Sequence, residues 1–477
     1  METINNFISN NWIKPNSKEY LPGINPATGE NFYQLANSNE IDLELAIESS
    51  KQALHPWQSM SLDQRSNCLA KLADLIEQNI DELAKLESLD NGKPISLASS
   101  IDIPRSAKNF RFYAHALTQF SAKSYQGDDK SLSYVLQQPL GIVACISPWN
   151  LPLYLLTWKI APALAAGNCV IAKPSELTPL TANKLSELII KAGFPAGVLN
   201  ILHGEGQQIG ELLCKHPQVK AVSFTGGTET GKLIAQNVAQ DFKKVSLELG
   251  GKNAAVIFAD CDFDRMLDTT MRSSFANQGE ICLCTSRIFI ERSIFDKTKL
   301  ALIEQVKKIK TGKPNSSETQ FGALVSKQHL NKIDNFVIQA KQDGCEIIIG
   351  GSPYQINDKG YYFEPTLITG LANDAAINQQ EVFGPVSCLI PFDSEQEVLA
   401  MVNDSKYGLS ATVWTKDINR AHRLADKIAT GIVWLNTWML RDLRTPFGGA
   451  KQSGLGREGG FDALDFFTEK KTVCLQY

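Results

Sequence analysis

Cys282 lies in the stretch Phe275–Arg287, FANQGEICLCTSR, and its surroundings suit a nucleophilic thiol. The residues before it have helical spacing and end in an Asn-Gln-Gly break. Cys282 is therefore expected on an irregular segment, where free backbone N–H groups can stabilise a developing oxyanion. The competing interpretation is a buried, inert cysteine that acts as a small apolar residue, and Cys284 is the alternative nucleophile.

Two further side chains could complete such a site. Asn150 follows the strand-like run GIVACISP, so its amide is expected at a strand carboxyl end, where it could be a second donor to an oxyanion. Glu248 ends the strand-like run VSLE before two glycines, and partial burial could raise the pKa of its carboxyl enough for a general base. The histidines show no spacing relation to Cys282, which favours Glu248 as the base. The alternatives are a turn asparagine and a solvated glutamate.

Two polar segments indicate a nucleotide site. Lys173, Ser175 and Glu176 follow the strand-like run NCVIA, where a carboxylate can accept hydrogen bonds from ribose hydroxyls. The same carboxylate would repel a 2′-phosphate, so NAD is favoured over NADP. The run FTGGTETG, residues 224–231, places glycines at an expected helix start, which suits a pyrophosphate, although it is not a GxGxxG fingerprint.

Length and composition limit the class of protein. A chain of 477 residues exceeds one hydrophobic core and predicts two or three domains. Its net charge of −4 gives no reason to expect nucleic acid or an anionic membrane as partner. The 10 cysteines show no CxxC pair, which favours reduced thiols, a cytoplasmic location and no metal site. The start lacks the pattern of a signal peptide, and the apolar run 151–167 contains Lys159, so it reads as a buried helix.

The elements that would position these residues follow a regular order. Two amphipathic helices are expected over 41–89, a helix over 101–122 and an exposed ribbon over 125–138. Strand-like and helical runs then alternate from Gly141 to Gly251, which predicts a doubly wound parallel sheet. A second alternating stretch, 253–436, predicts a separate α/β domain that contains Cys282.

These blocks, in this order, resemble the aldehyde dehydrogenase superfamily over nearly the whole chain. The blocks that carry the resemblance are SPWN, ELGGK, the cysteine stretch, EVFGPV, YGLSATVW, WLN and PFGG. One departure is Gly227, where most members of that superfamily carry Ser, and this puts the cofactor pose near the phosphate in doubt.

The resemblance implies an NAD-dependent dehydrogenase and a role for each matching residue. Cys282 would be the nucleophile, Glu248 the general base, and Asn150 with the backbone N–H of Cys282 the oxyanion hole. Lys173 and Glu176 would hold the adenine ribose. The cofactor-binding residues expected from the resemblance are Ser147, Trp149, Lys173, Ser175, Glu176, Gly206, Phe224, Gly226, Gly227, Leu249, Glu381 and Phe383.

The resemblance also extends to a branch of that superfamily. The runs SSFANQGEICLCTSRIFI and NTWMLRDLRTPFGGAKQSGLGREGG are similar to the 2-aminomuconic and 2-hydroxymuconic 6-semialdehyde dehydrogenases. Their substrates carry a carboxylate remote from the aldehyde, for which arginine is the suitable partner. Arg105 and Arg444 are the expected substrate-binding residues, and Arg441 is a weaker third candidate. The alternatives are another aldehyde, such as betaine aldehyde or an aliphatic one, or a non-catalytic protein with this fold.

The expected fold is α/β, with a doubly wound parallel-sheet cofactor domain, a second α/β catalytic domain and a small β oligomerisation arm. The expected ranges are 1–118 with 139–250 for the NAD-binding domain, 251–450 for the catalytic domain, and 119–138 with 465–477 for the arm. The resemblance implies a homodimer or homotetramer that acts on a small aldehyde.

Overall fold

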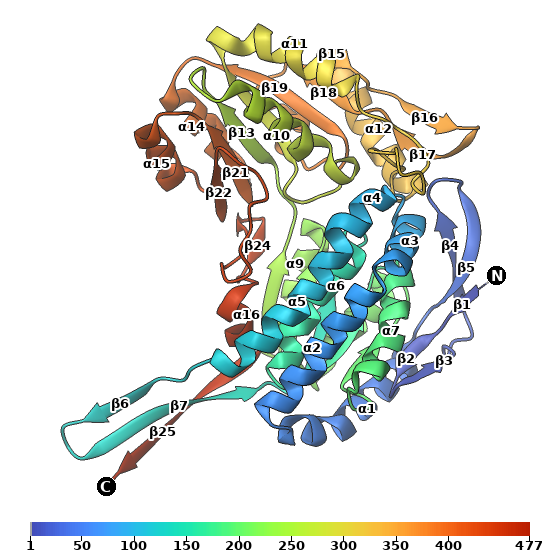
Figure 1. The fold of residues 1–477 in the computed structure, drawn as a ribbon, viewed down its shortest axis with the longest axis vertical. Coiled ribbons are helices and arrows are strands. Elements are labelled where there is room, and N and C mark those ends of the chain that lie inside the picture. Colours follow the sequence, from blue (N-terminus) through green and yellow to red (C-terminus); the bar gives the residue numbers. More distant parts are fainter. Residues whose placement is uncertain (1) are drawn as a thin grey trace.

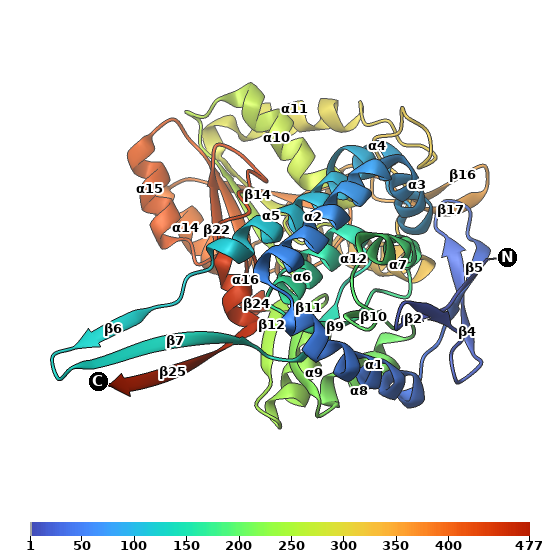
Figure 2. The same cartoon turned by 60° about the horizontal axis from the view of Figure 1, so that its bottom comes forward.

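The computed structural model describes residues 2–477 of the chain. Figure 1 shows two bodies of helices and strands, one above the other, and a long arm that projects away from both and carries the C-terminus at its tip. The same arm stands clear of the bodies in Figure 2.

The lower body is built on an eight-stranded sheet with the strand order β24-β12-β11-β8-β9-β10-β2-β3. Its central strands β8 to β12 pair in parallel, whereas β2, β3 and β24 are antiparallel to their neighbours. The order reverses on either side of β8, so a ligand crevice is expected beyond the carboxyl ends of β8 and β11. The strands are β2 (Asn6–Ile8), β3 (Asn11–Ile13), β8 (Ile142–Ile146), β9 (Cys169–Lys173), β10 (Leu199–Ile201), β11 (Val219–Thr225), β12 (Lys244–Glu248) and β24 (Gly454–Leu455).

Helices cover both faces of this sheet, and apolar side chains fill the space between. The crossovers predicted between the parallel strands are confirmed as helices α6, α7 and α9, and the segment between β10 and β11 forms η3 and α8. The helices of this body are α1 (Glu40–Ser59), α2 (Leu62–Gln78), α3 (Ile80–Asn91), α4 (Ile95–Leu97), α5 (Ile103–Ala116), α6 (Pro152–Ala165), α7 (Leu180–Ala192), α8 (Glu211–Lys215), α9 (Thr228–Ala239) and α16 (Gly460–Phe466). Three short helical turns accompany them: η1 (Ala98–Asp102), η2 (Leu117–Gln119) and η3 (Gly206–Gly210).

The prediction of two helices over 41–89 is wrong, because α1, α2 and α3 occupy this range. Ser61 begins α2 with a capping box, in which its side chain accepts from the backbone N–H of Gln64 and the Gln64 side chain accepts from the backbone N–H of Ser61. Asn79 then separates α2 from α3. The S-x-x-Q pattern of this capping box is a local sequence sign of the boundary between α1 and α2.

The helix predicted over 101–122 is shorter than expected. A π-helical turn, η1, precedes α5, and the 3₁₀ turn η2 ends it at Gln119. A π turn inserts an extra residue per turn and often lies at a functional site.

The upper body contains a seven-stranded sheet with the order β15-β18-β19-β14-β13-β21-β22. All neighbours are parallel except β15 and β18. The strands are β13 (Asn253–Ile257), β14 (Thr285–Glu291), β15 (Glu346–Ile349), β18 (Thr366–Thr369), β19 (Val386–Phe392), β21 (Ser410–Trp414) and β22 (Ile432–Leu435). The helices and turns are α10 (Phe263–Phe275), η4 (Ala276–Gly279), η5 (Arg292–Ile294), α11 (Phe295–Val306), α12 (Lys327–Gln342), α13 (Ala376–Gln379), α14 (Glu395–Asn403) and α15 (Ile418–Lys427).

The arm is a three-stranded antiparallel sheet of β6 (Ser124–Gly127), β7 (Ser131–Pro139) and β25 (Thr468–Gln476), with β7 in the middle. The predicted ribbon and carboxyl-terminal strand are thus strands of one sheet. Three small sheets complete the chain: β1 (Glu2–Ile4) with β4 (Tyr20–Asn25) and β5 (Glu30–Ala36), β16 (Pro353–Ile356) with β17 (Lys359–Phe363), and β20 (Tyr407–Gly408) with β23 (Ala450–Lys451).

The division of the chain into domains stays a prediction, and one strand pairs across its expected boundaries. β24, from the segment after residue 450, pairs with β12 of the first sheet. Within residues 2–477, no helix has the length and apolar character needed to cross a membrane.

Candidate active site

Cys282 lies on the irregular segment between α10 and β14, as the Asn-Gln-Gly break predicted. The backbone before it is strained, because Asn277 and Gln278 have φ values of 51° and 55°. Non-glycine residues in this conformation persist only where the surroundings hold them, and they gather at functional sites. The carbonyl of Cys282 accepts a hydrogen bond of 2.6 Å from Asn253 Nδ2, which fixes the segment to the start of β13.

The two neighbouring cysteines have different surroundings. Cys282 is partly exposed and lines a cavity of about 230 Å³ between the two bodies, together with Asn150, Gly226 and Glu381. Cys284 is buried, and its thiol donates to the carbonyl of Ala276 at 3.7 Å. A nucleophile must reach its substrate, so the geometry favours Cys282.

Asn150 follows β8 and lies in the same cavity. Its Nδ2 donates one hydrogen to the carbonyl of Glu280 at 2.8 Å. An amide nitrogen carries two hydrogens, so this bond orients the amide and leaves the second hydrogen for a ligand. The arrangement is suited to an oxyanion held between Asn150 and the cysteine segment.

Glu248 ends β12 and is buried, and within residues 2–477 neither carboxylate oxygen has a hydrogen-bond partner. Burial raises the pKa of its carboxyl well above the ordinary value, and the nearby carboxylate of Glu458 raises it further. A Cβ at Gly448 would lie 2.8 Å from Glu248 Oε1, so a glycine leaves the space that the carboxylate needs. A buried carboxyl of raised pKa is the form of glutamate that works as a general base near neutral pH.

A buried polar cluster near Glu248 was not predicted from the sequence. Lys159 Nζ donates to Glu458 Oε1 at 2.6 Å and to Ser223 Oγ at 3.2 Å, and Ser223 Oγ donates to the same carboxylate oxygen at 2.8 Å. The sequence did contain a sign of it, because a lone lysine in an apolar helix must find a buried partner. Glu458 and Lys159 act in opposite directions on the pKa of Glu248, which places both within electrostatic range of it.

Burial raises the pKa of the Cys282 thiol, and the carboxylates of Glu381 and Glu248 raise it further. A raised pKa makes a thiol hold its proton more tightly, and a cysteine must lose that proton before it can act as a nucleophile. Because the side chain is partly exposed, water can carry this proton away.

The residues expected to hold an adenine ribose meet at the carboxyl end of β9. Lys173 is buried, and its Nζ donates to Glu176 Oε2 and to the carbonyl of Pro174, both at 3.2 Å. Ser175 is buried, and its Oγ accepts from the backbone N–H of Leu177 at 3.3 Å. Gly206 begins the π turn η3, whose last residue, Gly210, packs near the Lys173 stem.

The glycine turn after β11 opens onto the helix start of α9. Gly227 is the N-cap residue of α9, and a Cβ there would meet no atom within 4 Å. The ring of Phe224 packs against Gly226, where a Cβ would lie 2.4 Å from it. Ser147 Oγ and Thr225 Oγ1 are buried beside this turn and lack a hydrogen-bond partner among the described residues. Free N–H groups at a helix start and orphaned hydroxyls fit a polar, phosphate-bearing ligand.

The cavity wall opposite this turn is aromatic and acidic. Trp149 and Phe383 meet edge to face with ring centroids 5.3 Å apart, and Phe383 has a strained φ of 61°. Glu381 accepts from the backbone N–H of Gly251 at 2.9 Å, and burial raises the pKa of its carboxyl. A Cβ at Gly250 would lie 2.0 Å from Glu381 Oε2, so the ELGGK glycines permit this approach. Leu249 also lines the cavity.

The expected substrate arginines have different positions. Arg105 is half-buried, and its Cζ lies 5.6 Å from the ring centroids of both Tyr154 and Trp158. Arg441 lies in the same place, with Cζ 5.1 Å from the Trp158 centroid and Nη1 donating to Tyr154 Oη at 3.1 Å. The structure thus brings Arg105 and Arg441 together.

Arg444 lies apart from this pair in the same loop as Arg441. Its side chain is 77% exposed and pairs with Asp442, with Nη2 to Oδ2 at 2.6 Å. Hydrogen bonds from Arg444 lower the pKa of Asp442 to about 2, and Arg105 also contributes, so the loop lies within electrostatic range of Arg105.

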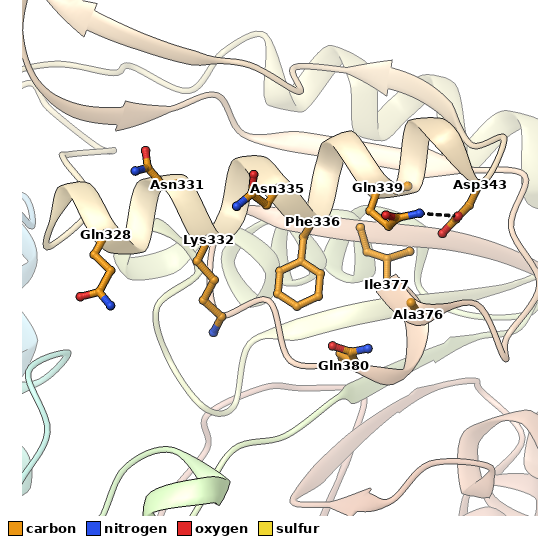
Figure 3. A pocket seen from close by; sticks show the side chains of 11 residues that line it. Gln328, Asn331, Lys332, Asn335, Phe336, Gln339, Asp343, Ala376, Ile377 and Gln380 are labelled. Carbon is orange, nitrogen blue, oxygen red and sulfur yellow. Dashed lines mark hydrogen bonds between the residues drawn. The ribbon is translucent and has the colours of Figure 1, made fainter. Parts of the chain in front are cut away.

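One cavity away from Cys282 is larger than the cavity that Cys282 lines. A surface groove of about 550 Å³ runs along α12 beside α13, and Figure 3 shows amide side chains and Phe336 along it. Its only lining residue that also lines the Cys282 cavity is Lys332. The groove contains no cysteine and no orphaned acid, so its size does not make it the reaction site.

The family profile described as "Aldehyde dehydrogenase family" matches residues 12–473. The chain belongs to this family. Within residues 2–477, no group of three or more His, Cys, Asp or Glu side chains is arranged to hold a metal ion.

Relatives of the chain fall in the predicted branch of the aldehyde dehydrogenases. It is 47% identical to the 2-aminomuconic semialdehyde dehydrogenase of Mus musculus, over 99% of this chain and 98% of that protein. It is 42% identical to the 2-hydroxymuconic semialdehyde dehydrogenase of Pseudomonas sp. (strain CF600), over 100% of both. The NAD⁺ complex of an aldehyde dehydrogenase from Bacillus cereus has a TM-score of 0.98 and 37% identity, over 100% of this chain and 97% of that chain.

Proposed function

We propose that the protein catalyses the NAD-dependent oxidation of a carboxylate-bearing semialdehyde, of the 2-aminomuconic or 2-hydroxymuconic 6-semialdehyde type, to the acid. The observation that carries this proposal is the pair of guanidinium groups, Arg105 and Arg441, on the aromatic wall near Cys282. Arg105 Nε and Nη2 are buried and have no hydrogen-bond partner within residues 2–477. Burial lowers the pKa of Arg105, and the charge of Arg441 lowers it further. An anion placed between the two guanidinium groups would offset both the loss of solvation and the repulsion between them.

Arg444 is the third donor in this proposal. It lies on the loop that carries Arg441, and it would exchange Asp442 for the remote carboxylate of the substrate. Because it must give up an existing ion pair, it contributes less than Arg105.

The residues around the cavity fit NAD. The orphaned Ser147 and Thr225 hydroxyls and the open N-terminus of α9 suit the pyrophosphate, and Lys173 with Glu176 suits the adenine ribose. Glu381 and Phe383 would position the nicotinamide riboside beside Cys282. NAD, when bound, accepts the hydride that leaves the substrate.

The chain's own groups carry the remaining chemistry. Cys282 loses its proton to water, its sulfur bonds to the aldehyde carbon, and the carbonyl electron pair moves to oxygen, where Asn150 and a backbone N–H stabilise it. Collapse of this thiohemiacetal expels hydride and leaves a thioester on Cys282. Glu248 then takes a proton from a water that attacks the thioester, the C–S bond breaks, and the acid leaves.

The substrate is tested by steady-state kinetics on the purified protein, with NAD and a panel of aldehydes. We expect the muconic semialdehydes to have the highest kcat/KM, above betaine aldehyde and plain aliphatic aldehydes. Equal kcat/KM for aldehydes with and without a remote carboxylate would contradict the proposed substrate but not the proposed chemistry.

We further propose a homodimer or homotetramer in the cytoplasm. The arm supports this, because Tyr125, Leu136 and Leu475 are 57%, 40% and 51% exposed on it. All 10 cysteines are free, which suits a reducing compartment. Light scattering on the full chain and on a variant with charged residues at these three positions tests the assembly, and an unchanged mass in the variant would contradict a role for the arm.

A further inference from the structure

The turn that carries Asn150 rests on a buried polar cluster that plays no part in the chemistry above. Lys93 is fully buried, and its ammonium group donates to Glu87 Oε1 at 3.1 Å, to Asp102 Oδ2 at 2.7 Å and to the backbone carbonyl of Asn150 at 3.0 Å. One ammonium has three hydrogens, and all three are used.

The cluster also holds the backbone on either side of Asn150. Glu87 Oε2 accepts from the backbone N–H of Leu153 at 3.3 Å, so this carboxylate caps the start of α6. Asn91 Nδ2 donates to the carbonyl of Trp149 at 2.9 Å. Side chains from α3 and the turn after it therefore hold the backbone at residues 149, 150 and 153 by hydrogen bonds.

Local backbone features place these side chains. Gly92 ends α3 with φ of 89°, and a Cβ there would lie 2.7 Å from the carbonyl oxygen of Ala323, so the turn passes close to the upper body. The π turn η1 ends at Asp102 and brings its carboxylate to Lys93. A buried cation among two carboxylates is costly to build and adds little stability over an apolar packing, which makes a positioning role the better explanation.

The same turn is held from the cysteine segment. Asn277 Nδ2 donates to the carbonyl of Asn150 at 3.1 Å and to the carbonyl of Glu280 at 3.3 Å. The carbonyl of Glu280 is also the acceptor for Asn150 Nδ2. Lys93 and the strained Asn277 thus share one acceptor, the Asn150 carbonyl, and the orientation of the Asn150 amide depends on both.

We propose that Lys93, held by Glu87 and Asp102, is a positioning residue that fixes Asn150 for oxyanion stabilisation. This inference rests on the proposed function, because Asn150 must be the oxyanion donor for its position to matter to the rate. Lys93 touches neither substrate nor cofactor in this account, and it acts only through Asn150.

A double-mutant cycle tests the proposal, with the pre-steady-state rate of NADH formation as readout. We expect Asn150→Ala to slow this step by roughly 100- to 1,000-fold, and Lys93→Met, of similar length but uncharged, to slow it by about 10- to 100-fold. The double variant should be within about threefold of Asn150→Ala alone, because both changes remove one interaction. The dissociation constant of NAD should stay unchanged in Lys93→Met.

Lys184→Met is the matched control. Lys184 also bridges two carboxylates, Glu82 at 3.0 Å and Glu187 at 2.8 Å, but it lies on α7 and does not contact the Asn150 turn. Its rate of NADH formation should equal that of the unchanged protein.

The positioning role would be overturned if the fold-losses in rate of the two single variants multiplied in the double variant. An unchanged rate in folded Lys93→Met would overturn it too. In either case the proposed function would stand. A full rate in Asn150→Ala would instead overturn the proposed oxyanion donor itself, and the role of Lys93 with it. If Lys93→Met does not fold, Asp102→Asn serves in the same cycle: it loosens Lys93 without removing it, and a smaller loss that disappears in the Asn150→Ala background is expected.

Discussion

The two sides of Cys282 are built from different kinds of groups. On one side, glycines, helix-start N–H groups, Trp149, Glu381 and Phe383 form a surface suited to a nucleotide. On the other, Tyr154, Trp158 and Phe447 form an aromatic wall that carries two guanidinium groups. The first side depends mainly on backbone geometry, whereas the second depends on side-chain identity. The second side should therefore decide which aldehyde the enzyme accepts.

The largest expected effect concerns the residue between the two sides. Cys282→Ala should abolish NADH production, by at least about 10⁴-fold, because Cys282 is the proposed nucleophile and, among the described residues, no other thiol lines the cavity that contains Asn150. Cys284→Ala is the control and should retain most of the activity. Stopped-flow absorbance of NADH measures both variants. If Cys284→Ala lost the activity and Cys282→Ala retained it, the nucleophile would be Cys284.

The next prediction isolates the aromatic side. Arg105→Met should lose about 2–5 kcal/mol of binding for the carboxylate-bearing substrate, or roughly 30-fold to several thousand-fold in kcat/KM. For an uncharged aliphatic aldehyde of similar length, kcat/KM should change little, and NAD affinity should stay the same. An equal loss for both aldehydes would show that Arg105 supports the fold of the wall rather than the choice of substrate.

A smaller effect is expected at the outer edge of that side. Arg444→Ala should lower kcat/KM for the semialdehyde by about 5- to 30-fold, since the gained contact replaces an exposed ion pair. Asp442→Asn should have the opposite sign, because it frees Arg444 for the substrate. The two variants are compared in the same steady-state assay. A higher kcat/KM in Arg444→Ala, or a lower kcat/KM in Asp442→Asn, would show that Arg444 does not bind the substrate carboxylate.

The smallest expected effect is a shift in the pH dependence of thioester hydrolysis when Glu458, the charged neighbour of Glu248, is replaced. The base must be ionised to take a proton, and burial with Glu458 raises its pKa, so the rate of thioester hydrolysis should rise with pH through that raised pKa. Glu458→Gln removes the negative neighbour and should move this rise to lower pH. The pH profile of kcat measures the shift. A rise that moves to higher pH, or does not move, would show that Glu458 does not act on Glu248.

The sequence was informative where chemistry depends on the local backbone. The break before Cys282, the glycines beside Glu248 and the turn after β11 could be located from residue types alone, and the alternating pattern predicted the parallel sheets. It was less informative where partners come from distant segments. The pairing of Lys159 with Glu458, the approach of Arg105 to Arg441, and the contact of Lys93 with the Asn150 carbonyl join residues far apart in the chain, and no spacing rule predicts such contacts.

Helix boundaries show the same limit on a smaller scale. The break between α1 and α2 has a sign in the sequence, the capping box at Ser61, because a cap is a local pattern. The π turn before α5 has no such local sign in the sequence, and Asp102 at its end accepts a hydrogen bond from the buried Lys93.

The most direct test of the central claim is to trap the covalent intermediate. Glu248→Gln removes the proposed general base, so hydrolysis should stall, and incubation with NAD and the semialdehyde should add the mass of one acyl group to the intact protein. Peptide mass spectrometry should place that acyl group on Cys282. An unmodified Cys282, or an acyl group on Cys284, would contradict the account.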